Sequence, residues 1–105
     1  MASIWMGLFE VEWDDEKAAS NLQKHGISFK EAATVFQDEN GLYQVDSKHS
    51  DYELRFLLIG VSSKRRMMAV IHVERSYLKL RIISARAPTT KEMKDYERTM
   101  LGQSR

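Results

Sequence analysis

Three consecutive strand-like segments in the C-terminal half constrain the fold more than any other feature of this chain. Residues 55–61, 67–74 and 78–87 are rich in isoleucine, leucine and valine, as β-strands are. The connections between them are short, and strands joined by short connections pair as antiparallel hairpins. Pro88 ends the third strand, because proline cannot donate to the sheet ladder. The sequence therefore predicts an antiparallel meander, to which residues 42–45 could add a fourth strand.

Two helices are predicted before this meander. Residues 9–13 alternate apolar and acidic side chains, which indicates a half-buried strand. Asp14 can then cap a helix that runs to about His25. Ser28 and Glu31 have the spacing of a capping box, so a second helix begins there.

A third helix is predicted after the sheet, since Thr89 and Glu92 form another capping box. Together these elements predict an α+β domain. In it, two N-terminal helices pack on a twisted antiparallel sheet of about four strands, with a helix at the C-terminus. We expect a single domain over residues 9–101, a loose extension at residues 1–8 and a short tail at residues 102–105.

Composition narrows the class of protein. The chain has 105 residues and no cysteine, which excludes disulfides, thiolate metal sites and a cysteine nucleophile. Its apolar runs are far shorter than the roughly 20 residues that span a bilayer, so no membrane partner is expected. We expect the protein to work in the reducing cytoplasm.

The distribution of charge indicates a polyanion as a partner. Residues 1–53 hold four lysines, no arginine and eleven acids, whereas residues 54–105 hold twelve basic side chains and four acids. All eight arginines lie from Arg55 onward. Guanidinium groups bind phosphate through two parallel hydrogen bonds, so this half is a candidate nucleic-acid surface. The alternative is that the two halves neutralise each other across the fold.

The predicted hairpins sort the charged side chains of this half into two groups, one at each end of the sheet. The first end gathers Arg55, Glu74, Arg75 and Lys79. The second end gathers Lys64, Arg65, Arg66 and Arg86. Both groups could lie along one nucleic-acid strand. Each also has a structural alternative, namely cross-strand ion pairs at the first end and a solvated turn at the second.

Arg86 is the basic residue for which a purely structural role is hardest to find. By period two it shares a face with Leu80, Ile82 and Ser84, which is the expected core side of the sheet. A long cation there requires an acid or a ligand. The alternative to a functional role is an ion pair with Glu92 on the last helix.

The histidines do not predict a metal site, because the three lack the close spacing of metal ligands. His25 is either a structural cap at a helix end or a group that transfers protons, since imidazole does so readily near neutral pH. His72 is expected to be a half-buried strand residue. We therefore expect neither a metal nor another cofactor.

Two motifs, taken together at their spacing, resemble the BrnT family of toxins, and the resemblance extends over about residues 9–98. The first motif is Lys24-His25-Gly26-Ile27-Ser28-Phe29. The second motif is Arg81-Ile82-Ile83-Ser84-Ala85-Arg86. The resemblance implies a RelE-like fold, metal-independent endoribonuclease activity, and neutralisation by a BrnA-type antitoxin, with a heterotetramer of two toxins and two antitoxins as one assembly.

The resemblance also places the active site near the end of the last strand. We therefore expect Arg86 and Arg66 to bind the scissile phosphate and His25 to move protons. The alternative groups for proton transfer are Glu74, Glu92 and Tyr96. The residues expected to hold neighbouring phosphates are Lys64, Arg65, Arg55, Arg75 and Lys79. Two alternatives remain at this point: a non-catalytic module that binds RNA or a protein, and a purely structural partner.

Overall fold

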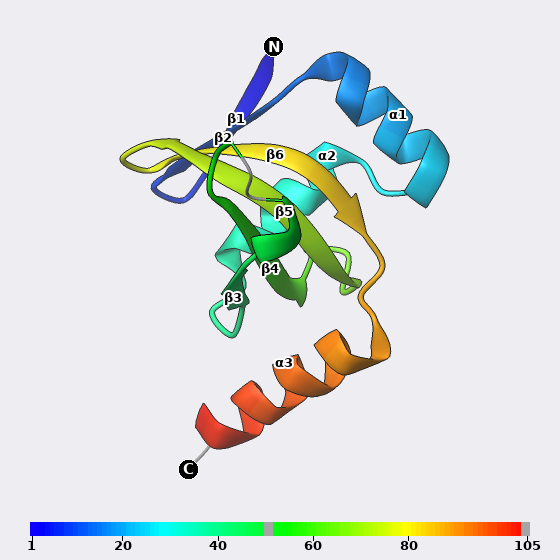
Figure 1. Cartoon of the computed structure of the whole chain (residues 1–105), viewed down its shortest axis with the longest axis vertical. Coiled ribbons are helices and arrows are strands. Elements are labelled where there is room, and N and C mark those ends of the chain that lie inside the picture. The colour runs from blue at the N-terminus through cyan, green and yellow to red at the C-terminus, as the bar shows by residue number, and fades with distance from the viewer. Residues whose placement is uncertain (50–51, 104–105) are drawn as a thin grey trace.

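The computed structural model describes residues 1–49 and 52–103. Figure 1 shows the course of the chain. Its elements, in order, are β1 (Ala2–Met6), β2 (Phe9–Trp13), α1 (Asp15–His25), α2 (Phe29–Ala33), the 3-10 helix η1 (Thr34–Gln37), β3 (Leu42–Val45), the 3-10 helix η2 (Ser47–His49), β4 (Arg55–Val61), β5 (Met67–Ser76), β6 (Lys79–Arg86) and α3 (Thr90–Gln103).

The strands form one mixed sheet of six strands in the order β1-β2-β6-β5-β4-β3. Neighbours that follow one another in the chain pair antiparallel, whereas β2 pairs parallel with β6, with Glu12 opposite Arg81. The α+β class is confirmed, but the predicted antiparallel sheet of about four strands is wrong in strand number and in direction. Only hairpin spacing can be read from a sequence, and most of the chain separates β2 from β6.

The N-terminal residues also differ from the prediction. Residues 1–8, expected as a loose extension, contain the edge strand β1, which turns into β2 at Gly7 with a φ of +61°. Ile4 and Met6 pack against the core, while Trp5 between them is exposed. Two strands therefore precede the helices: β2, which was predicted at residues 9–13, and β1, which was not, so the description of the helices as N-terminal is wrong.

Both predicted helix starts are present. The Asp14 carboxylate accepts hydrogen bonds from the first turn of α1, and Gly26 ends that helix with a φ of +68°, which favours glycine. The Ser28 hydroxyl caps α2 by accepting from the Glu31 amide at 3.0 Å. The second helix is nevertheless shorter than expected, since α2 has five residues and continues as η1.

One face of the sheet packs against these helices and forms the core. The sheet contributes Val11, Leu58, Met68, Val70, Leu80, Ile82 and Ala85, and the helices and their connections contribute Ile27, Phe29, Ala32, Ala33, Val35 and Phe36. Asn21 of α1 fastens this layer to the end of β6, because its side chain donates to the Ala85 carbonyl at 2.9 Å and accepts from the Ala85 amide at 3.0 Å.

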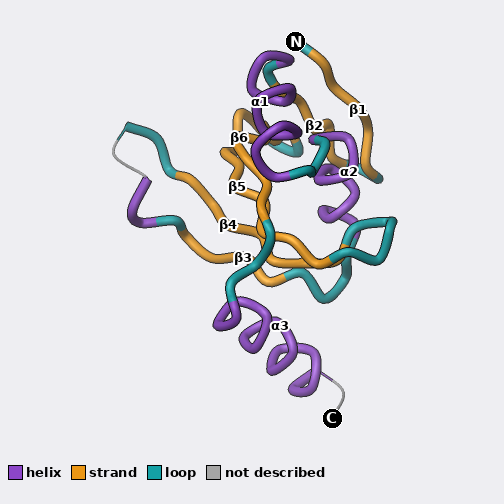
Figure 2. The backbone as a smooth tube through the Cα atoms, turned by 90° about the vertical axis from the view of Figure 1, so that its right-hand side faces the viewer, coloured by secondary structure: helices purple, strands orange, loops and turns teal. Residues whose placement is uncertain are grey.

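The last helix lies apart from the other two, beyond the end of the sheet (Figure 2). Tyr96 is buried, and its hydroxyl donates to Asp38 Oδ2 at 2.7 Å, which ties α3 to the segment after η1. Helix α3 continues to Gln103 and so includes the first two residues of the tail expected at 102–105. Residues 104–105 of that tail and residues 50–51 of the loop before β4 lie outside the described residues. No helix among the described residues is long and apolar enough to cross a membrane.

An irregularity in β6 decides which face its basic side chains occupy. Ile71 pairs with Ser84, but the next residue, His72, pairs with Ile82, so Ile83 is an extra residue in β6. Such a bulge reverses the phase of the alternation beyond it. Arg86 therefore lies opposite to the buried face of Ile82, and the period-two assignment of Arg86 to the core face is wrong.

Candidate active site

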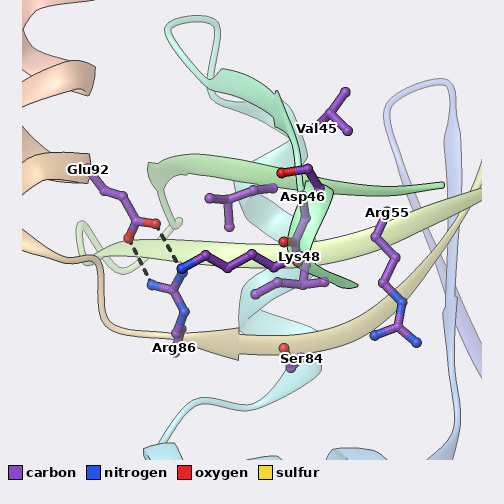
Figure 3. Close-up of a pocket in the computed structure, with 10 residues that line it drawn as sticks. Val45, Asp46, Lys48, Arg55, Ser84, Arg86 and Glu92 are labelled. Carbon is purple, nitrogen blue, oxygen red and sulfur yellow. Dashed lines mark hydrogen bonds and ion pairs between the residues drawn. The ribbon is translucent and has the colours of Figure 1, made fainter. Parts of the chain in front are cut away.

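The sheet face opposite the helices carries a hollow of about 560 Å³ at the end where β6 meets α3 (Figure 3). It is lined by Val45, Asp46, Ser47, Lys48, Arg55, Leu57, Ile71, Ser84, Arg86 and Glu92. Leu57 and Ile71 form part of its floor through the paired strands β4 and β5. Arg86 and Arg55 lie at its two ends (Figure 3). The hollow therefore combines an apolar floor with a cation at each end, and the carboxylates of Asp46 and Glu92 also line it. The two cations could bind successive phosphates of a phosphodiester chain.

Arg86 is held by Glu92 of α3. Its Nη1 donates to Glu92 Oε1 at 2.8 Å, and its Nη2 donates to Glu92 Oε2 at 3.0 Å, so the carboxylate meets the outer end of the guanidinium (Figure 3). Nη1 also donates to the Ala87 carbonyl at 3.2 Å. The Arg86 side chain is 35% exposed and that of Glu92 is 13% exposed. The sequence alternative of an Arg86–Glu92 ion pair is thus confirmed, and it lies on the wall of a hollow.

The contacts of Arg86 leave one edge of its guanidinium available. A guanidinium has five N–H groups, and the described contacts use both hydrogens of Nη1 and one of Nη2. The Nε–H and the second Nη2–H remain, and these two lie side by side on one edge of the plane. That edge can donate two parallel hydrogen bonds to a phosphate. Hydrogen bonds to Glu92 raise the pKa of Arg86 and hold that of the Glu92 carboxyl below its ordinary value, so both groups stay ionised.

Arg66 has a different environment. Its Nε donates to Glu31 Oε2 at 2.9 Å and its Nη2 donates to Glu31 Oε1 at 2.5 Å, while Nη2 also donates to the Gly26 carbonyl at 3.3 Å. Glu31 is almost fully buried, with its side chain 2% exposed, and also accepts from the Ser62 hydroxyl at 2.7 Å. The side edge of Arg66 is therefore occupied, and its partner belongs to the helix layer on the opposite side of the sheet from the hollow. The structure does not bring Arg66 and Arg86 together.

The remaining predicted residues are spread over the sheet. Lys64 and Arg65 are exposed in the turn between β4 and β5. Glu74 and Arg75 line a separate hollow of about 430 Å³ at the opposite hairpin, between β5 and β6. Arg75 Nη1 lies 3.5 Å from Glu53 Oε2, an ion pair that the sequence did not predict. The structure therefore separates Glu74 from Arg86, and of the residues predicted at the first end it brings only Arg55 into the hollow with Arg86.

His25, which lies in α1, and His72, which lies in β5, differ in exposure. His25 is exposed at the end of α1, one helical turn after Asn21, and does not line the hollow. His72 is buried against Phe36 and Phe56, at ring-centroid distances of 4.8 and 5.9 Å. Burial lowers the pKa of His72 to about 4, only partly offset by its hydrogen bond to the Val70 carbonyl. His72 is therefore a neutral core residue, more deeply buried than the sequence suggested.

One basic residue of β6, Arg81, was not predicted as a site residue. Arg81 lies on the same side of β6 as Arg86, and its Nε donates to Glu12 Oε2 at 2.6 Å. Lys79 Nζ lies 3.3 Å from Glu12 Oε1. Burial raises the pKa of Glu12, but hydrogen bonds from Arg81 and Lys79 outweigh it and leave this pKa below its ordinary value. The Lys79-x-Arg81 alternation is visible in the sequence, whereas nothing there places Lys48, which lines the hollow from η2.

Comparisons with known proteins find a matching family model and a similar solved structure. A family model described as "Ribonuclease toxin, BrnT, of type II toxin-antitoxin system" matches residues 13–92. A 1.1 Å crystal structure of the Brucella abortus ribonuclease toxin BrnT has a similar fold, with a TM-score of 0.55 and 24% sequence identity. The match covers 76% of this chain and 96% of that chain. No curated protein matches the chain.

The fold and the family match define the class as the ribonuclease toxins of type II toxin–antitoxin systems. Within that class, the chain belongs to the BrnT family. Within the described residues, no three histidine, cysteine, aspartate or glutamate side chains are grouped to hold a metal ion.

Proposed function

We propose that this protein is an endoribonuclease toxin that cleaves RNA at the Arg86 hollow without a metal ion. The observation that carries the proposal is the position of Arg86, whose Nε–Nη2 edge remains available on the wall of a hollow of about 560 Å³. Arg55 and Lys48 line the same hollow and would bind phosphates next to the scissile one. The RelE-like arrangement implied by the sequence motifs is part of this proposal.

The proposed reaction uses the RNA's own nucleophile. The 2′-hydroxyl oxygen attacks the adjacent phosphorus and loses its proton, and the bond from phosphorus to the 5′-oxygen breaks. The 5′-oxygen then takes up a proton, which leaves a 2′,3′-cyclic phosphate and a 5′-hydroxyl. The protein aligns the attack and stabilises the charge that develops on the phosphate oxygens, which is the part assigned to Arg86.

His25 remains the group predicted for proton transfer, because imidazole transfers protons readily near neutral pH, although it is exposed at the end of α1 and does not line the hollow. Glu74 is a weaker candidate, because it lines the separate hollow at the opposite hairpin. Lys64, Arg65, Arg75 and Lys79 are assigned to RNA further from the cut, where cations contribute charge rather than geometry.

A BrnA-type antitoxin is the proposed partner, in an assembly that could hold two copies of each chain. Membership of a toxin–antitoxin family supports the need for such an inhibitor. The two proteins and their RNA would meet in the cytoplasm. An inhibitor that covered the hollow would block RNA entry and hold Arg86 unavailable.

The test is an analysis of the products formed by the purified protein. Single-stranded RNA of mixed sequence is incubated with the protein in the presence of a chelator, beside the same strand built of 2′-deoxynucleotides. We expect RNA fragments that end in 2′,3′-cyclic phosphates and no cleavage of the deoxy strand. Intact RNA at high protein concentration would favour a non-catalytic binding module, and equal cleavage of both strands would rule out attack by the 2′-hydroxyl.

A further inference from the structure

We propose that Glu92 is a positioning residue for this reaction, which holds Arg86 by the outer end so that its side edge meets the scissile phosphate. The proposal rests on the proposed function, because it assigns a partner to the arginine that is placed at the phosphate. It adds a role for a carboxylate that would otherwise be expected to repel RNA. Its basis is the geometry of the two side chains and the way in which Glu92 itself is fixed.

Glu92 is held in place before any ligand binds. Its Oε1 accepts from the Thr89 backbone amide at 2.8 Å, and its own amide donates to Thr89 Oγ1 at 3.1 Å, so the predicted capping box is formed. One turn later, the buried Tyr96 anchors the same helix to Asp38. Both the backbone position of Glu92 and the orientation of its carboxylate are therefore fixed. Through its two hydrogen bonds, the carboxylate orients the Arg86 guanidinium.

The N–H groups that a carboxylate occupies decide whether it positions the arginine or competes with a phosphate for it. A carboxylate on the Nε–Nη2 edge would occupy the donors that a phosphate needs, as Glu31 does on Arg66. Glu92 instead takes Nη1 and one hydrogen of Nη2. Glu92 and a phosphate can then bind Arg86 at the same time, on adjacent edges of one plane. An arginine fixed in this way loses little orientational freedom when the phosphate arrives.

The experiment compares Glu92→Gln with the matched variant Glu97→Gln. Glutamine at position 92 can still accept from Thr89, but its amide nitrogen cannot accept from Arg86. Glu97 is exposed on the same helix, so its substitution removes the same charge without contact to the hollow. Turnover is measured with single-stranded RNA of mixed sequence, binding with its 2′-deoxy form, and folding by thermal unfolding.

We expect Glu92→Gln to lower kcat by about 10- to 100-fold while the affinity for the deoxy strand stays equal or rises several-fold. The value of kcat falls because Arg86 loses its fixed orientation, whereas the affinity does not fall because a negative charge is removed from the hollow. We expect Glu97→Gln to leave kcat unchanged. An unchanged or increased kcat in Glu92→Gln would overturn the proposal, because Glu92 would then be a bystander or a competitor of the phosphate.

A second pair of variants tests whether Glu92 acts through Arg86. Lysine at position 86 keeps the charge but has no planar edges to divide between two partners. We expect Glu92→Gln to cause no further loss of kcat in an Arg86→Lys background. A full additional loss there would overturn the proposal. If instead Arg86→Ala cleaves RNA at the wild-type rate, the proposed function itself fails, which is a distinguishable result.

Discussion

Two arginine–glutamate pairs at the same end of the sheet show how similar contacts can leave an arginine with different chemistry. Both glutamates stand three residues after the cap of a helix, Glu31 after Ser28 and Glu92 after Thr89. Both accept two hydrogen bonds from one guanidinium. The Glu31 side chain is 2% exposed, whereas that of Glu92 is 13% exposed on the wall of a hollow.

The edge of the guanidinium that each glutamate occupies is the decisive difference. Glu31 takes the Nε–Nη2 edge of Arg66, and the Gly26 carbonyl takes a further Nη2 hydrogen, which leaves only Nη1 for any other acceptor among the described residues. Glu92 takes the outer end of Arg86 and leaves the Nε–Nη2 edge. We infer that the Arg66 pair stabilises the fold and that the Arg86 pair prepares a phosphate site.

The largest effect expected from this comparison is on activity. Arg86→Ala should lower the rate of RNA cleavage by about 10²- to 10³-fold, because a donor aimed at the developing charge is lost. Arg66→Ala should retain activity within about threefold when rates are compared per folded molecule. Initial rates on a labelled single-stranded RNA measure both. Equal losses in the two variants would show that the occupied edge does not distinguish the two arginines.

The second effect is on stability, and it falls on the other pair. Arg66→Ala leaves the Glu31 carboxylate buried with only Ser62 as a side-chain partner, so we expect the free energy of unfolding to fall by about 2 kcal/mol. This loss is smaller than that for a fully buried ion pair, because Arg66 is 48% exposed and solvent screens its charge. Urea unfolding measures it.

Two controls accompany the stability measurement. Arg98→Ala breaks an exposed pair with Asp95 on α3 and should change the free energy of unfolding by less than about 0.5 kcal/mol. Arg66→Ala combined with Glu31→Gln should be more stable than Arg66→Ala alone, since the unpaired charge is removed. A double variant as unstable as the single one would mean that packing, and not charge, explains the loss.

The sequence was informative about local structure and less so about which residues meet. Strand segments, helix caps and the Arg86–Glu92 pair follow from short-range patterns such as Thr-x-x-Glu, and the structure contains them. The bulge at Ile83 was not visible, because an inserted residue in a run of Ile, Ile and Ser leaves no mark in the alternation. That one residue decides which face Arg86 occupies.

The capture of Glu31 by Arg66 could not be predicted for a related reason. Ser28-x-x-Glu31 reads as a capping box, and the serine does cap the helix. The carboxylate, however, binds a guanidinium 35 residues away, where the end of a hairpin lies beside a helix start. Local spacing predicts the hydrogen bonds that a side chain can make to its own helix. Whether it makes those bonds or binds a distant side chain depends on the register of a strand far away in the sequence.

The smallest expected effect is the pH dependence of the stability difference between wild type and Arg66→Ala. Hydrogen bonds from Arg66 hold the pKa of Glu31 below its ordinary value of 4.5. A carboxyl with a lowered folded pKa contributes stability above 4.5 that is lost as the pH falls through the folded pKa. The folded protein holds His72 neutral, with a pKa of about 4, so protonation of His72 in the unfolded chain lowers stability as the pH falls below 6.5. This loss is the same in wild type and variant, so it cancels in the difference. We therefore expect the difference in unfolding free energy to be constant near neutral pH and to shrink as the pH falls through 4.5 toward 3.5. Urea unfolding at each pH measures it, and a difference that stayed constant down to pH 3.5 would mean that Arg66 acts on Glu31 through packing alone.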